Sequence, residues 1–125
     1  MRKLLIILAV FVSGWTTLQN WIPSFCDANQ SAKIVDVRVG VERIDCSRPQ
    51  LEQILPVQAN LQWFQVYSKT KGMTQGDVLR VVDPIKKIVD EWVERGDGSR
   101  GYCTIKRKLL LEQTERAAVV IQGRW

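Results

Sequence analysis

The residue types that carry most enzyme chemistry near neutral pH are scarce in this chain of 125 residues. It contains no histidine, the commonest general base at that pH. A carboxylate pair is the remaining option, and Asp90 and Glu94 lie four residues apart, on one face of a helix. Acidic side chains on the outside of a helix are normally solvated, and Lys86 and Lys87 are spaced to pair with them. The sequence therefore predicts no catalytic residue and a non-enzymatic protein.

The cysteines Cys26, Cys46 and Cys103 are the other candidates for chemistry. They form no CxxC pair, and no histidine can join them, so the sequence predicts neither a metal site nor a cofactor. In an exported chain that loses Cys26, the other two are an even pair and predict one disulfide. Closing a loop of this length would stabilise a small domain by roughly 4 kcal/mol in the chain-entropy model. The alternative is two separate buried thiols.

The start of the chain has the order of an export signal. Two basic residues precede an uninterrupted apolar run from Leu4 to Val12, and Cys26 and Ala28 occupy the small positions of a cleavage site. We therefore expect a signal peptide over residues 1–28 and a single exported domain over residues 29–125.

An uncleaved segment is the main alternative. Residues 4–23 are just long enough to cross a bilayer as a helix, although polar residues in their second half make a poor span. In composition this segment resembles the signal-anchor-release segments of some phage lysis proteins, without a shared motif. Retention would anchor the domain outside the cytoplasm and leave Cys26 as a thiol able to link two copies. A third alternative is a buried helix in a cytoplasmic protein.

A strand is the element that the sequence predicts most strongly. Val35, Val37, Val39 and Val41 alternate with polar residues and glycine, which is typical of a half-buried strand over residues 33–45.

Helices are expected in the middle of the chain. Residues 74–95 carry one apolar stripe, with Pro84 kinking or restarting the helix. A short helix is expected to end at Pro56, and residues 57–71 fit helical spacing better than strand alternation.

The C-terminal segment, residues 103–122, fits two structures. It reads as a hairpin, or as a helix whose apolar face contains Leu110, Leu111, Thr114, Ala117, Ala118 and Ile121. A lone strand needs hydrogen-bonding partners, so we expect the hairpin. The predicted fold is thus α+β, a small, mainly antiparallel sheet packed against two or three helices.

Two groups of residues are candidate contact sites. Trp63, Phe64 and Tyr67 cannot all be buried on one helix, so at least one should be exposed and available to a protein partner. Lys106, Lys108 and Arg100 could contact an anionic surface; the chain carries a formal net charge of +5. For an exported chain we expect no nucleic-acid partner.

Together these features predict an exported, periplasmic or secreted protein-binding or structural module of the cell envelope, stapled by one disulfide. The alternative is an inner-membrane-anchored envelope or phage lysis component that retains its N-terminal helix.

Overall fold

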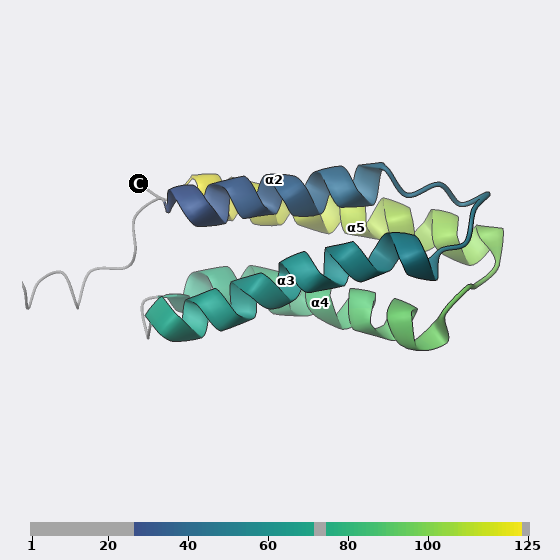
Figure 1. Ribbon diagram of the computed structural model, residues 1–125. Helices are drawn as coiled ribbons and strands as arrows, with labels where there is room; N and C mark the ends of the chain where they lie inside the picture. Colours follow the sequence, from purple (N-terminus) through teal and green to yellow (C-terminus); the bar gives the residue numbers. More distant parts are fainter. Residues whose placement is uncertain (1–26, 72–74, 124–125) are drawn as a thin grey trace, which may run out of the picture.

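The computed structural model describes residues 27–71 and 75–123 (Figure 1). These residues form four helices: α2 (Ala28–Glu42), α3 (Leu51–Lys71), α4 (Gly76–Arg95) and α5 (Arg100–Gln122). Each helix runs antiparallel to the one before it, and the contacts close a ring because α2 packs against both α3 and α5. The architecture is an up-and-down four-helix bundle.

The predicted α+β fold is wrong. The described residues contain no strand and no sheet, and helices account for nearly all of them. Short connections between consecutive helices place them side by side, and each buries one apolar stripe in a shared core.

The strand predicted over residues 33–45 is instead most of α2 and the start of the following loop. The side chains that α2 buries recur at spacings of four, three and four: Gln30, Ile34, Val37 and Val41. Val37 and Val41 fit both a strand and a helix, but Val35 is 44% exposed, which the alternating pattern does not allow. Packing in the bundle overrides the strand preference of the valines.

The predicted hairpin over residues 103–122 is also wrong, because α5 is one continuous helix. Its buried side chains include most of the face expected for the helical alternative, although Leu111 of that face is half-buried. The buried side chains are Cys103, Leu110, Thr114, Ala117, Ala118 and Ile121. Ser99 caps the helix by accepting a 3.1 Å hydrogen bond from the N–H of Tyr102.

Two helices continue through a proline. The predicted end at Pro56 is wrong, since α3 runs past it, and α4 likewise runs past Pro84. Both prolines are exposed, so the carbonyl group that each leaves without its helical partner faces the solvent side. The prediction of a helix over residues 74–95 agrees with α4; Thr74 lies outside the described residues.

The core extends along the bundle and holds two large aromatic side chains, Trp92 and Phe64, both fully buried. At Gly40 the helices α2 and α3 approach closely, because a Cβ atom there would lie 3.0 Å from Cγ2 of Val57. Any larger residue at position 40 would push against Val57.

None of the described helices is both long enough and apolar enough to span a membrane. Of the predicted export segment, residues 1–28, only Asp27 and Ala28 are among the described residues, so Cys26 lies outside them.

Candidate functional site

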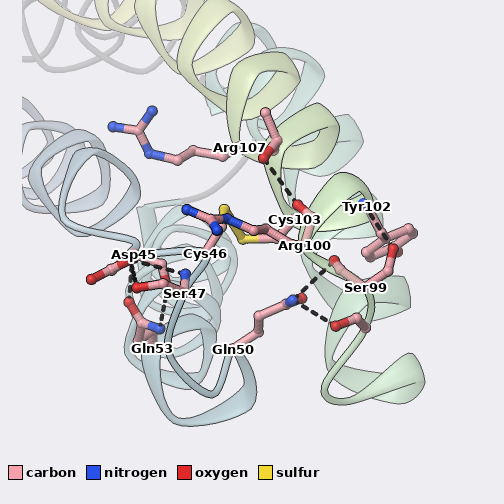
Figure 2. The surroundings of a disulfide bond; sticks show 12 residues. Asp45, Cys46, Ser47, Gln50, Gln53, Ser99, Arg100, Tyr102, Cys103 and Arg107 are labelled. Carbon is pink, nitrogen blue, oxygen red and sulfur yellow. Dashed lines mark hydrogen bonds between the residues drawn. A yellow bond between two sulfur atoms is a disulfide. The ribbon is translucent and has the colours of Figure 1, made fainter.

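A disulfide closes one end of the bundle (Figure 2). It joins Cys46, in the loop between α2 and α3, to Cys103, in the first turn of α5, with 5.6 Å between the Cα atoms. Cys103 is fully buried and Cys46 half-buried. This is the pair that the sequence indicates, although the elements around it are helices and a loop rather than strands.

Gln50 organises the same end of the bundle, and its role was not predicted. Its side-chain oxygen accepts a 2.9 Å hydrogen bond from the indole N–H of Trp92, which is otherwise surrounded by the core. Its amide group donates to the carbonyl groups of Gly98 and Ser99 at 2.8 and 3.1 Å (Figure 2). Gln50 therefore links the start of α3 to α4 and to the loop before α5.

Asp97 caps α3 from that loop. Its Oδ1 accepts hydrogen bonds from the N–H groups of Gln50 and Leu51 at 2.8 and 2.9 Å. A helix N-terminus leaves such N–H groups unpaired, so this carboxylate stabilises α3 through a contact distant in sequence.

The aromatic residues predicted as a partner interface divide between core and surface. Phe64 is fully buried, whereas Trp63 and Tyr67 are half-buried. The rings of Trp63 and Tyr67 stack at 4.4 Å between centroids, and Nζ of Lys33 lies 5.3 Å from the Trp63 ring. Two of the three side chains therefore reach the surface, at the boundary between α2 and α3.

Tyr67 belongs to a network at the start of α2. Its hydroxyl donates a 2.7 Å hydrogen bond to Oδ2 of Asp27, and Nζ of Lys71 lies 3.6 Å from that oxygen. Oδ1 of Asp27 accepts from the N–H groups of Asn29 and Gln30, so Asp27 is the N-cap of α2. Partial burial opposes ionisation of Asp27, but these hydrogen bonds outweigh it and hold its pKa below the ordinary value.

One face of α3 carries exposed side chains that no sequence prediction singled out. We call these residues the α3 stripe; they are separated by alternating steps of three and four: Glu52, Leu55, Ala59, Gln62, Val66 and Lys69. All are exposed, and the apolar side chains Leu55 and Val66 are 44% and 58% exposed. Steps of three and four place residues along one line of a helix surface, as at a helix–helix contact.

The α3 stripe also lacks charge along its middle. Residues 53–68 contain no Asp, Glu, Lys or Arg, whereas a segment of this length would carry about four at the chain's 25% charged fraction. Protein interfaces are depleted in charged residues at their centre. This gap in the charge pattern was the signal that could have located the face from sequence.

The basic residues predicted to contact an anionic surface lie on α5 but do not form one face. Lys106 and Lys108 are two residues apart, which on a helix turns them about 200° from each other. Lys106 is half-buried, with Nζ 5.5 Å from the ring centroid of Tyr102, while Arg100 and Lys108 are exposed. The hairpin on which Lys106 and Lys108 would share a face is not formed.

Two open depressions lie at the C-terminal half of α5, and they share Arg116 and Val120. One is lined only by α5, and the other by α5 together with Val81 and Pro84 of α4. Val119, which lines the first, is 68% exposed. Charged side chains, including Glu112, Glu115 and Arg116, line this surface, in contrast to the α3 stripe.

The carboxylate pair of α4 is part of the helix surface. The carboxylate of Asp90 accepts hydrogen bonds from Nζ of Lys86 at 2.7 Å and from the side-chain amide of Gln58 at 2.9 Å. Glu94 is exposed. Partial burial opposes ionisation of Asp90, but these two hydrogen bonds outweigh it and hold its pKa below the ordinary value. The predicted pairing of Lys86 with an acidic neighbour is therefore present.

Comparison with known proteins gives no match: no family model, no curated protein and no solved structure is similar to this chain.

Proposed function

We propose that this chain is an exported, non-enzymatic protein-binding module of the cell envelope, periplasmic or secreted, which presents the α3 stripe to a protein partner. The observation that carries the proposal is the disulfide between Cys46 and Cys103. Disulfides persist in oxidising compartments such as the periplasm and are rare in the cytosol. The export-like order of residues 1–28 supports the same compartment.

The binding role is supported by the surface of α3. Its exposed, charge-free middle has the composition of an interface centre, and the half-buried Trp63 lies on the same helix. A rigid bundle tied at one end by a disulfide holds such a face in a fixed shape, which lowers the entropy cost of binding.

One observation favours the alternative, a membrane-anchored envelope or phage lysis component that retains its N-terminal segment. Cleavage before Asn29 would remove Asp27, the N-cap of α2 and the acceptor of the Tyr67 hydrogen bond. A retained segment would keep that cap.

Intact mass spectrometry of the protein recovered from an envelope fraction tests both readings. We expect a mass that begins at Asn29 and is two hydrogens lighter without reductant than with it. A full-length mass with the same redox difference would favour the anchored component. Recovery of the reduced chain from the cytoplasm would overturn the proposal, and a C46A/C103A variant, which lacks the redox difference, is the control.

A further inference from the structure

We infer that the partner of the α3 stripe is a second copy of this chain, bound through an antiparallel pairing of two α3 helices. This inference deepens the proposed function and rests on it, because it names the partner of the proposed binding face.

The α3 stripe is symmetric about its middle, between residues 60 and 61. A two-fold axis at that point reverses one helix relative to the other, so residues equally far from the middle face each other across the pair. Each of the three facing pairs is complementary. The acidic Glu52 faces the basic Lys69, the apolar Leu55 faces the apolar Val66, and the small Ala59 faces the longer Gln62.

The charges at the two ends select the antiparallel arrangement. In an antiparallel pair, Glu52 of each copy lies beside Lys69 of the other, which gives two attractive contacts. In a parallel pair, Glu52 would face Glu52 and Lys69 would face Lys69, which gives two repulsive contacts. Glu52 is 3.7 Å from Arg48 in the single chain, but both side chains are exposed and such a pair holds its partners weakly.

The spacing suits direct helix packing. Steps of three and four are those of helices that cross at a shallow angle with interlocking side chains. Ala59, near the axis, lets the two helices approach closely, and Gln62 of the other copy lies over it. Among the described helices, α3 packs against α2 and α4, and these helices leave the opposite side of α3 open to a second copy.

The interface is small. Two helices of 21 residues touch along at most about 30 Å, which places the contact at the low end of specific interfaces. We therefore expect a dimer with a Kd of roughly 10–100 µM.

A charge exchange between Glu52 and Lys69 tests this arrangement by sedimentation velocity on the purified protein with its disulfide intact. We expect E52K alone and K69E alone to weaken the dimer about 10-fold, because each creates two like-charge contacts. An equimolar mixture of E52K with K69E, and the double variant E52K/K69E, should recover wild-type association. Association through residues 1–28 or through Cys26 would not follow this pattern, and a link through Cys26 would disappear on reduction.

Two valine variants locate the surface. V66E should abolish the dimer, whereas V119E, which places the same charge on a similarly exposed valine of α5, should leave it unchanged. Helical circular dichroism of every variant checks that the bundle is folded. A wild-type protein that is monomeric at about 300 µM, single charge variants that associate like wild type, or a dimer lost in V119E but kept in V66E would each overturn the inference. A monomer that is nevertheless exported and oxidised would leave the proposed function standing, whereas a dimer formed by a reduced cytoplasmic chain would overturn only that function.

Discussion

The hydroxyl of Tyr67 donates a 2.7 Å hydrogen bond to the carboxylate of Asp27. This contact joins the last turns of α3 to the residue that caps α2, forty positions earlier in the sequence. Lys71 lies 3.6 Å from the same carboxylate, so one acidic side chain connects two helices at the end of the bundle opposite the disulfide.

In a chain that retains its N-terminal segment, Asp27 should make the bundle less stable in acid. Its pKa is lower in the folded protein than its ordinary value of 3.8, so the unfolded chain takes up the proton first as the pH falls. The stabilisation is complete well above pH 3.8 and is lost as the pH falls through the folded pKa. We expect wild type to melt higher than D27N at pH 7, and this difference to shrink as the pH falls below 3.8 and through the lowered pKa of folded Asp27.

Asparagine also caps helices well, so D27N tests the charge rather than the cap. The matched control is D36N, which alters an exposed carboxylate 3.8 Å from Lys33. This variant should lose melting temperature in acid as the wild type does. Thermal melts followed by circular dichroism between pH 7 and pH 2 measure both effects. If the melting temperatures of wild type and D27N changed equally with pH, ionised Asp27 would not stabilise the bundle.

In the chain that retains Asp27, removing the Tyr67 hydroxyl should destabilise the bundle by about 1 kcal/mol, because Y67F keeps the ring stacked on Trp63 but removes the donor to Asp27. The effect should depend on Asp27. A double-mutant cycle measured by urea unfolding tests this dependence. The loss of unfolding free energy in the double variant Y67F/D27A should be smaller than the sum of the losses in Y67F and D27A. Strict additivity would show that the two side chains do not interact.

Reducing the disulfide should lower the free energy of unfolding by roughly 4 kcal/mol, because the bond closes a loop of 57 residues in the unfolded chain. Chemical unfolding with and without reductant measures the difference. C46A/C103A should be insensitive to reductant and should match the reduced wild type within the additional cost of truncating the buried Cys103.

Gln50 should matter more to stability than its neighbour Gln53. Q50A leaves the indole N–H of Trp92 buried without an acceptor, which costs about 1–3 kcal/mol. Q53A removes hydrogen bonds to Asp45 and Pro49 that are exposed, where water can replace the lost partner. In urea unfolding, Q50A should therefore have a much lower free energy of unfolding than Q53A. The opposite order would show that the hydrogen bonds of Gln50 do not stabilise the bundle.

The sequence identified some elements of this fold and misread others for physical reasons. The apolar stripe of α4 has an unmistakable helical period, so that helix was predicted. In α2, a run of valines follows a two-residue alternation as well as a helical stripe, and the buried Gln30 interrupts the helical reading. Gln30 is acceptable in the core because its amide donates a 2.8 Å hydrogen bond to Gln75, which no local pattern reveals.

The candidate site was recoverable only in part. The pairing of Cys46 with Cys103 follows from cysteine arithmetic. Phe64 is buried and Trp63 and Tyr67 are half-buried, so none of the three aromatic side chains is as exposed as the sequence led us to expect. Gln50 and Asp97 act through hydrogen bonds between segments more than forty residues apart, and spacing along the chain gives no sign of such contacts.

The disulfide also decides how the molecule would carry a pulling force. It closes a covalent ring from residue 46 to residue 103 that contains the whole of α3 and α4, while α2 and most of α5 lie outside it. Tension applied along α2 and α5 passes through the sulfur–sulfur bond and bypasses the ring. The oxidised chain should therefore extend about 200 Å less than the reduced one in a single-molecule pulling experiment, because 57 residues stay out of the stretched path. The backbone of α3, the helix that bears the proposed contact face, therefore lies outside the covalent path that carries the load.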